Sequence, residues 1–348
     1  MRPAYGLKSI AGRLALAIAA AGTLAACQPF NAPMDTLSTN SDLGKWIYSL
    51  FLQITIWDSI VMVIVIVALL LAIFVFSTRE GEPGEPSEHE SDLMLELAWT
   101  VGPALILMFI TIPTIHTIIK TQPSKWPADT LTVQVRAHQW WWEFDYPGFK
   151  IQTADELHLP EYQVVHLELL SEDIIHSFWV PALGGKRDVI PGQINQITLI
   201  PNTTGEFYGQ CAEFCGLSHA NMRFRVVVDT PDGFKRWVAA QQAPPAEPTS
   251  PAAIAGEKIF KDAPCAICHQ IRGISGFSLQ YKYGFRGPDL THFASRGTLA
   301  GSIFPNTPEN VALWIQDPDK VKPGAEMPTL GLRGTDLQDL VAYLESLK

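Results

Sequence analysis

The sequence predicts a multidomain chain in which a two-helix transmembrane hairpin is followed by a β-sandwich and then by an all-α domain. Three observations lead to this fold class. Two long apolar runs lie in the first third of the chain. Short segments of alternating apolar and polar residues follow, and helical patterning around a Cys-x-x-Cys-His motif occupies the last quarter. At roughly 100–200 residues per domain, the 348 residues accommodate two or three domains.

Composition and charge exclude several classes of protein. Apolar residues make up 47% of the chain and charged residues 17%, against about 25% charged in an ordinary globular protein, so part of the chain avoids water by means other than a folded core. The formal charge of −10 argues against a nucleic acid as partner, because phosphate binding needs a basic surface. The five cysteines are too few and too clustered for a disulfide scaffold, which indicates metal or cofactor chemistry.

Residues 1–26 have the pattern of a secretory signal peptide that is removed from the mature protein. Three basic residues and no acid precede an apolar run, and small residues follow it. The sequence Leu24-Ala-Ala-Cys27 resembles a bacterial lipobox, so we expect Cys27 to be the lipidated first residue of the mature chain and an anchor in membrane lipid. A plain signal peptide with an incidental cysteine is the alternative.

Residues 27–121 are expected to form the transmembrane hairpin, with spans at about 54–76 and 97–119. The first contains 17 consecutive apolar residues, and the second has 23 residues without a formal charge, so each approaches the length of about 20 residues that crosses a bilayer. The link holds one arginine against three lysines on the outer flanks, which by the positive-inside rule would place the link outside. We expect the reverse, because a removed signal peptide delivers the chain to the outer face and two spans return it there. The later domains are therefore expected on the periplasmic side of a bacterial inner membrane.

The remaining chain is expected to contain a β-sandwich or barrel over 122–238, a linker over 239–255 and a helical domain over 256–348. Period-two alternation between Pro-Gly turns predicts the strands, and an Ala-, Pro- and Gln-rich composition predicts a semi-rigid spacer. The clearest strands are Leu131–Ala137, Val164–Leu170, Ile194–Ile200 and Met222–Asp229, and the clearest helices are Pro308–Gln316 and Thr335–Leu347.

A segment of twelve residues between two predicted strands contains Cys211, Cys215, His219 and Met222. Soft sulfur ligands combined with imidazole select copper or zinc over hard cations. A mononuclear blue-copper site needs two histidines and one cysteine, whereas this loop has one cysteine more and one histidine fewer. With His176 from an earlier strand, the two thiolates can bridge a pair of copper ions. The alternative is a structural zinc site, which has no use for the methionine.

This loop and three further motifs resemble subunit 2 of cytochrome c oxidase in the haem-copper family. The further motifs are His138-Gln-Trp-Trp-Trp142, Gly185-Lys-Arg-Asp-Val-Ile-Pro-Gly192 and Glu96-Leu-Ala-Trp-Thr100, and the resemblance covers about residues 40–235. It implies that the β domain is cupredoxin-like and holds a dinuclear copper centre, CuA. The implied ligands are His176, Cys211, Cys215, His219, Met222 and the backbone carbonyl of Glu213.

The resemblance also implies roles for three side chains beside the copper ligands. Trp140 is similar to the aromatic residue through which electrons enter, on the surface above the copper; a packed tryptophan is the alternative. The Glu213 side chain would reach a magnesium ion shared with the catalytic subunit. Glu96 matches the glutamate at the mouth of a proton pathway, and the alternative is an acid that complements a helix dipole.

Cys265-Ala-Ile-Cys268-His269 is the attachment pattern of a c-type haem, in which the two thiols form thioethers and the histidine ligates iron. Met327 is expected as the opposite axial ligand and His292 is its competitor, because Met/His and bis-histidine pairs both occur on haem iron. The sequence Gly287-Pro-Asp-Leu290 and the Met-Pro step at 327 resemble class I cytochromes c. A covalent haem also requires an extracytoplasmic location.

Together these features predict the subunit through which electrons enter a terminal respiratory cytochrome c oxidase of the caa type. Electrons would pass from haem c to CuA and on to a catalytic subunit that reduces oxygen to water, coupled to proton translocation. The expected partners are that catalytic subunit 1, a subunit 3, and soluble cytochrome c or the cytochrome bc1 complex as donor. The chain is expected to be an enzyme only as part of this complex.

Two other functions stay open at this point. One is a subunit of a nitrous oxide or nitric oxide reductase that also uses CuA, and the other is a non-catalytic copper-delivery lipoprotein. A quinol oxidase subunit is disfavoured, because that branch of the family lacks the copper ligands.

Overall fold

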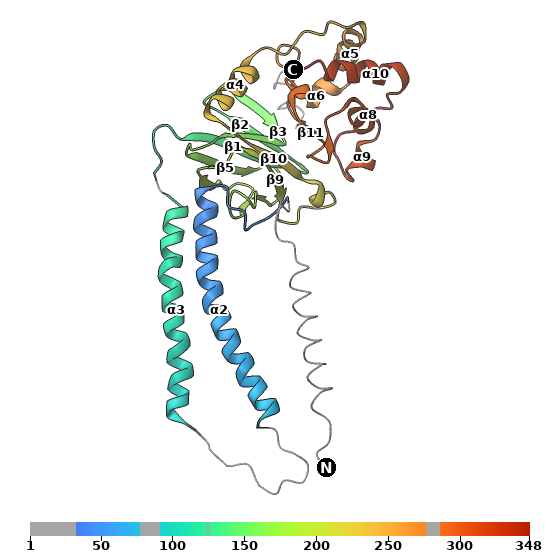
Figure 1. Ribbon diagram of the computed structural model, residues 1–348. Helices are drawn as coiled ribbons and strands as arrows, with labels where there is room; N and C mark the ends of the chain where they lie inside the picture. Colours follow the sequence, from blue (N-terminus) through green and yellow to red (C-terminus); the bar gives the residue numbers. More distant parts are fainter. Residues whose placement is uncertain (1–32, 77–90, 124, 276–285) are drawn as a thin grey trace, which may run out of the picture. The chain divides into compact units, whose positions relative to one another are not determined.

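The computed structural model describes residues 33–76, 91–123, 125–275 and 286–348. The predicted signal peptide, Cys27 and most of the predicted link between the spans lie outside the described residues. Figure 1 shows two long helices, a domain of two β-sheets and a domain of short helices, which confirms the predicted fold class.

The second predicted span lies within α3 (Leu93–Thr121), and the first lies within α2 (Asp42–Phe74) except for its last two residues, 75 and 76. Both helices are long and apolar enough to cross a membrane, and nearly all of their apolar side chains are exposed on the chain by itself. The rings of Trp57 and Phe109 stack with centroids 5.9 Å apart. The two helices therefore pair as a hairpin.

Helix α2 starts on the β domain, well before the apolar run. The Ser41 hydroxyl caps the helix and donates to the Leu183 carbonyl at 2.5 Å. The Asp42 carboxylate accepts from the Ile200 amide at 2.6 Å. These bonds fix the membrane anchor to the domain that carries the candidate metal ligands.

Ten strands form two five-stranded sheets that pack face to face. The sheet orders are β3-β2-β1-β5-β8 and β4-β10-β9-β6-β7. The strands are β1 (Leu131–His138), β2 (Trp141–Tyr146), β3 (Ile151–Ala154), β4 (Glu156–Pro160), β5 (Val165–Ser171), β6 (His176–Trp179), β7 (Arg187–Val189), β8 (Asn195–Leu199), β9 (Gly205–Cys211) and β10 (Arg223–Asp229). The four strands predicted from alternation are β1, β5, β8 and β10, so those predictions are confirmed.

Aromatic side chains fill the space between the sheets. Trp142, Phe178 and Phe224 are buried, and the ring centroid of Phe224 lies 5.3 Å from that of Trp142 and 4.8 Å from that of Phe178. Strand β10 buries every second residue from Phe224 onward, as the period of two requires. This core holds rigid the strand ends that carry the candidate site.

The linker prediction over 239–255 is wrong at both ends. Helix α4 (Pro231–Gln242) extends into it, because Phe234 and Val238 form an apolar face that is buried against the β domain. Helix α5 (Pro251–Asp262) begins inside it at a Ser250 cap. Only residues 243–250 connect the two helices.

The C-terminal domain packs its first helix against its last. It contains α5, α6 (Cys265–Cys268), η2 (Phe293–Ser295), α8 (Pro308–Gln316), α9 (Pro318–Val321) and α10 (Gly334–Leu344), with short strands β11 (Thr298–Leu299) and β12 (Phe304–Pro305). A β-carbon on Gly256 of α5 would lie 1.9 Å from the Asp339 carbonyl oxygen of α10. The glycine therefore permits the close crossing that holds α6 in place.

Candidate functional site

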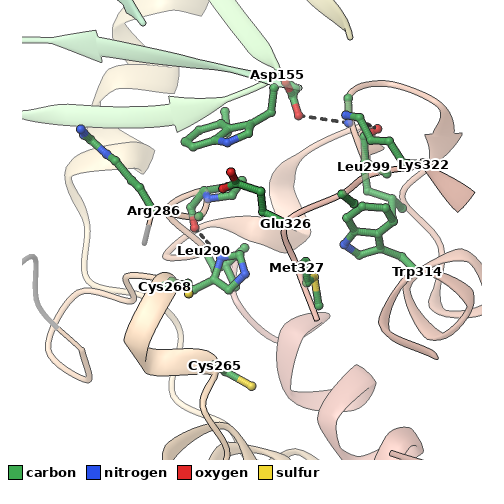
Figure 2. A pocket seen from close by; sticks show the side chains of 18 of the residues that line it. Asp155, Cys265, Cys268, Arg286, Leu290, Leu299, Trp314, Lys322, Glu326 and Met327 are labelled. Carbon is green, nitrogen blue, oxygen red and sulfur yellow. Dashed lines mark hydrogen bonds between the residues drawn. The ribbon is translucent and has the colours of Figure 1, made fainter. Parts of the chain in front are cut away.

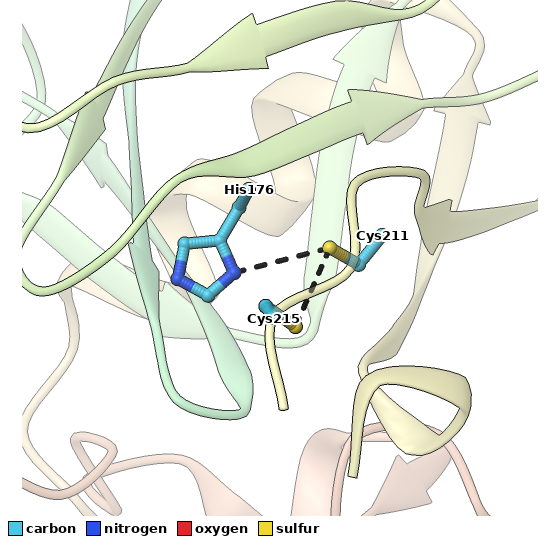
Figure 3. A group of neighbouring side chains, drawn as sticks. All are labelled: His176, Cys211 and Cys215. Atoms are coloured by element: carbon cyan, nitrogen blue, oxygen red, sulfur yellow. Dashed lines mark hydrogen bonds between the residues drawn. The ribbon is translucent and has the colours of Figure 1, made fainter. Parts of the chain in front are cut away.

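Three buried side chains form the centre of a candidate metal site (Figure 3). His176 is the first residue of β6, Cys211 is the last residue of β9, and Cys215 lies in the following loop. The two Sγ atoms are 3.8 Å apart, and His176 Nδ1 lies 3.8 Å from the Cys211 Sγ. Because β6 and β9 are hydrogen-bonded neighbours in one sheet, the strand pairing brings the histidine to the cysteines.

The other three predicted donors lie on either side of the sulfur pair. The Glu213 carbonyl oxygen is 3.2 Å from the Cys211 Sγ. The His219 Nδ1 is 3.5 Å and the Met222 Sδ is 3.8 Å from the Cys215 Sγ. The Cys211 amide donates to the Met222 carbonyl at 3.0 Å, which closes the loop. The structure thus brings together all six residues that the sequence nominated as copper ligands.

Hydrogen bonds at the cluster favour the deprotonated, thiolate form of one of the two cysteines. A hydrogen bond from the Cys215 thiol lowers the pKa of Cys211 to about 3 and correspondingly raises the pKa of Cys215. Burial opposes a charge on the His176 imidazole, but its hydrogen bonds to Asp173 and Cys211 raise its pKa. Such a paired arrangement favours uptake of a cation between the sulfurs.

The donor set fits copper better than a structural zinc ion. The two cysteine sulfurs lie at the centre of the cluster. One imidazole and the carbonyl lie beside the Cys211 sulfur, and the other imidazole and the thioether lie beside the Cys215 sulfur. One tetrahedral ion has room for four of these six donors, and zinc sites are built from cysteine, histidine and carboxylate rather than methionine. A pair of copper ions that share the thiolates uses all six.

Asp173 is a residue of this site that the sequence interpretation missed. Its carboxylate accepts from His176 Nε2 at 2.6 Å and from the Gln139 amide at 2.5 Å. The first bond leaves Nδ1 of His176 directed at the sulfurs, as happens where a carboxylate accepts from the other ring nitrogen of a metal-bound histidine. The three-residue spacing between Asp173 and His176 is the sequence signal that would have identified it.

A cavity of about 510 Å³ lies in the C-terminal domain and is closed on one side by the β domain (Figure 2). Cys265, Cys268 and His269 line it from α6 and the residue that follows, and Met327 and Trp314 line it from the rest of the domain. The lining is mostly apolar, and the volume is in the range of cofactor sites. The thiols and the imidazole of the haem motif therefore share one cavity with the predicted axial methionine.

The imidazole of His269 is oriented for ligation. Its Nδ1 lies 2.8 Å from the Pro288 carbonyl, which fixes the tautomer with Nε2 free of a proton. Burial lowers the pKa of His269, so the neutral form that binds iron is favoured. His292 is placed differently: its Nε2 lies 3.1 Å from each of two carbonyl oxygens at the end of α4.

Trp140 lies between the cavity and the sulfur pair. Its indole Nε1 donates to the Cys215 carbonyl at 2.8 Å, and the Gln139 side chain donates to the same carbonyl at 2.9 Å. Trp140 also lines the cavity, and its side chain is buried instead of lying on an open surface. A β-carbon on Gly324, which has φ of 81°, would lie 2.7 Å from the indole, so the C-terminal domain covers the ring.

The carboxylates of Glu213 and Glu96, which the sequence predicted as functional, lie outside both the sulfur cluster and the cavity. The Glu213 side chain is exposed, although its carbonyl belongs to the sulfur cluster. Glu96 lies in the first turn of α3, at the helix end opposite to Thr121, which leads into the β domain. It belongs to neither the sulfur cluster nor the cavity.

Comparisons with known families match three parts of the chain. Residues 40–117 match the transmembrane domain of cytochrome c oxidase subunit II, and residues 150–230 match the periplasmic domain of the same subunit. Residues 253–348 match cytochrome c.

Relatives of similar length are also found. Cytochrome c oxidase subunit 2 of Alkalihalophilus pseudofirmus is 32% identical, covering 90% of this chain and 91% of that one. The same subunit of Bacillus sp. strain PS3 is 38% identical, covering 78% of this chain and 80% of that one. A crystal structure of the periplasmic domain of subunit II of cytochrome oxidase from Bradyrhizobium japonicum is 32% identical and covers 33% of this chain and 96% of that one, with a TM-score of 0.32.

Proposed function

This chain belongs to the cytochrome c oxidase subunit II family, with a cytochrome c domain fused at its C-terminal end, and we propose that it is the subunit through which electrons enter its haem-copper oxidase complex. Its C-terminal domain would receive the electron, and its β domain would pass the electron to the catalytic subunit that reduces oxygen to water. Coupling to proton translocation belongs to the same proposal.

The residues that would hold the cofactors are those of the two described clusters. His176, Cys211, the Glu213 carbonyl, Cys215, His219 and Met222 would bind a dinuclear CuA centre. Cys265 and Cys268 would bind haem c covalently, with His269 and Met327 as axial ligands. When bound, these groups supply the one-electron redox chemistry that the side chains lack.

The single observation that carries the proposal is the position of Trp140. The indole ring lines the cavity on one side and donates to the Cys215 carbonyl on the other. Within the described residues, this is a path of one side chain and one hydrogen bond from the haem motif's cavity to the sulfur cluster. Its burial under Gly324 makes the fused domain the neighbour from which the ring would accept an electron.

Further parts of the proposal concern the membrane and the partners. Lipidation of Cys27, a bacterial inner membrane and a periplasmic location of both cofactor domains follow from the sequence pattern. The Glu213 side chain is exposed and so is free to reach a magnesium ion at the catalytic subunit. Glu96, near the N-terminus of α3, is the candidate for the mouth of a proton pathway. The catalytic subunit, subunit 3 and a cytochrome c or bc1 donor complete the assembly.

The family comparisons support an oxidase over the two alternatives. The membrane part and the β domain each match oxidase subunit II.

Metal analysis and electron paramagnetic resonance of the intact complex test the copper assignment. We expect two copper ions and one covalent haem c per chain, and a seven-line hyperfine pattern from an electron shared by the two coppers. A Met222→Leu variant should keep both coppers but shift their potential, because the thioether is a weak ligand. A single zinc ion, or a four-line copper spectrum in the unmodified chain, would contradict the proposal.

The axial ligand of the haem is tested by a pair of variants. Met327→His should lower the reduction potential of haem c, because a Met/His pair raises it. His292→Gln should leave the potential unchanged, since His292 binds carbonyls at the end of α4. A potential that responds to His292 and ignores Met327 would reverse the assignment.

A further inference from the structure

Lys322 is a buried cation at the boundary between the two cofactor-bearing domains. It follows α9, and only 4% of its surface is exposed. Its ammonium group donates to the carbonyl of Trp140 in the β domain and, at 3.2 Å, to the carbonyl of Ala300 in its own domain. The side chain therefore joins the peptide unit of the buried tryptophan to the domain with the cavity.

Asp155, in the β domain, accepts hydrogen bonds from backbone amides of both domains. It lies between β3 and β4, and 7% of its surface is exposed. One carboxylate oxygen accepts from the Trp142 amide at 2.9 Å, and the other accepts from the Gly301 amide at 3.1 Å. Figure 2 shows Asp155 and Lys322 facing each other at the top of the cavity.

The two charged residues hold the same two segments from opposite sides. Lys322 contacts the carbonyls of residues 140 and 300, and Asp155 contacts the amides of residues 142 and 301. Trp140 lies in the turn at residues 139–140, Trp142 is the second residue of β2, and residues 300–301 form a turn beside the cavity.

Further hydrogen bonds fix the position of the C-terminal domain on the β domain. The Glu156 carboxylate accepts from the amides of Gly297 and Thr298 at 2.6 Å and 3.1 Å. Next to the sulfur loop, the Ser218 hydroxyl donates to the Pro323 carbonyl at 2.7 Å. Each bond joins one domain to the other, so sliding of the boundary would break several at once.

We propose that Lys322 and Asp155 form a buried lock that fixes the C-terminal domain on the β domain with Trp140 in contact with both, and that Lys322 is a positioning residue for electron transfer within the chain. Two buried charges are costly to desolvate, and apolar residues of equal volume often stabilise a fold more. The two side chains instead fix the orientation of Trp140 and of the cavity wall, because their hydrogen bonds are made to the peptide groups of those segments. The proposal rests on the proposed function, since it concerns the rate of the same transfer.

The test compares three single variants in the assembled complex. Lys322→Met keeps the length of the side chain but removes its donors. Asp155→Asn removes the charge but keeps an oxygen acceptor, and asparagine tolerates the φ of 59° at this position. Lys320→Met is the matched control, because Lys320 lies two residues away and its side chain is exposed.

Two readouts are taken on each variant after its haem and copper spectra have been recorded. One is the rate of electron transfer from flash-reduced haem c to copper. The other is hydrogen exchange of peptides that contain Trp142 and Gly301. We expect Lys322→Met and Asp155→Asn to slow the transfer and to speed the exchange by about tenfold or more, because each change removes buried, charge-assisted hydrogen bonds across an interface. The spectra and both reduction potentials should stay unchanged, and Lys320→Met should match the unmodified chain.

The outcomes separate the lock from the function on which it rests. Transfer rates in Lys322→Met and Asp155→Asn that equal those of Lys320→Met, with intact spectra, would overturn the positioning role. Faster exchange with an unchanged transfer rate would do the same, because the boundary would then be only a structural contact. Absence of the haem or copper spectrum in the unmodified complex would instead refute the proposed function.

Discussion

At the scale of single residues, Asp173 connects the sulfur cluster to the turn that bears Trp140. The carboxylate accepts from the His176 ring and from the Gln139 amide, and the Gln139 side chain returns to the Cys215 carbonyl. The orientation of one candidate ligand and the position of the tryptophan turn are therefore coupled through one side chain.

Replacing Asp173 should weaken copper binding without unfolding the domain. Asparagine keeps the shape but loses the charge that orients the His176 ring, and loss of such a partner typically lowers metal affinity about 10–100-fold. Competition with a chelator measures the affinity, and Asp129→Asn in an exposed loop is the control. Equal affinity in the two variants would remove Asp173 from the site.

The charge state of Lys322 makes a prediction for pH. Burial lowers its pKa to about 8 from 10.5, although the negative charge of Asp155 acts in the opposite direction. Between about pH 8 and pH 10.5, the folded and unfolded pKa values of Lys322, the folded chain binds fewer protons than the unfolded chain. The free energy of unfolding therefore rises with pH in this range, by at most about 1.4 kcal/mol per pH unit.

Lys322→Met lacks this contribution. The difference in melting temperature between the unmodified chain and the variant should therefore shift in favour of the unmodified chain between about pH 7.5 and 9.5. Haem absorbance during heating gives both temperatures. A difference that is constant or shifts the other way would show that the lysine keeps its ordinary pKa.

At the scale of elements, the helices that frame the cavity depend on one close crossing. Gly256 in α5 faces the backbone of α10, and Phe260 and Tyr343 pack beside it with ring centroids 5.8 Å apart. The crossing joins the start of the domain to its end, so it determines where α6 carries the thiols of the haem motif.

An alanine at Gly256 should destabilise the C-terminal domain. Its β-carbon would lie 1.9 Å from a backbone oxygen that has no rotamer to change, and overpacking of this kind costs about 1–3 kcal/mol. This corresponds to a loss of about 4–8 °C in melting temperature per kcal/mol for a domain of this size. Gly148→Ala, where nothing lies within 4 Å of the new carbon, is the control and should melt like the unmodified chain.

At the scale of the whole molecule, the membrane hairpin, the β domain and the C-terminal domain are connected by buried contacts as well as by the chain. Ser41 and Asp42 bind α2 to the β domain, and Lys322 and Asp155 join the β domain to the C-terminal domain. Screening by salt acts on exposed charges and much less on buried ones.

Electron transfer within the chain should therefore be nearly independent of ionic strength. We expect the rate from haem c to copper to change by less than about twofold between roughly 20 mM and 0.5 M salt. Reduction of the complex by a separate, charged donor protein should slow over the same range, because that encounter is steered by exposed charge. A strong salt dependence of the internal step would show that exposed charges hold the two domains together.

The sequence by itself indicated the chemistry of this protein, because most of the proposed donors of each cofactor are encoded at short range. Cys211 to Met222 form one loop and Cys265 to His269 one turn, so spacing alone identified the kinds of atom that would meet. The two spans were equally visible, since a bilayer requires a continuous apolar run. Strands β6 and β9 were not, because β6 has only four residues and β9 buries only Gly209 and Cys211 at its end, so neither shows a clear alternation.

Only the tertiary structure decided how the two cofactor sites are connected. Trp140 and Lys322 are 182 residues apart, and no local pattern relates a buried lysine to a distant carbonyl. The burial of Trp140 and the bond from Asp173 to Gln139 likewise depend on surfaces that fit only after folding. The reason is physical: most members of each ligand set lie close together in the chain, whereas docking is a property of the shapes and charges of two folded surfaces.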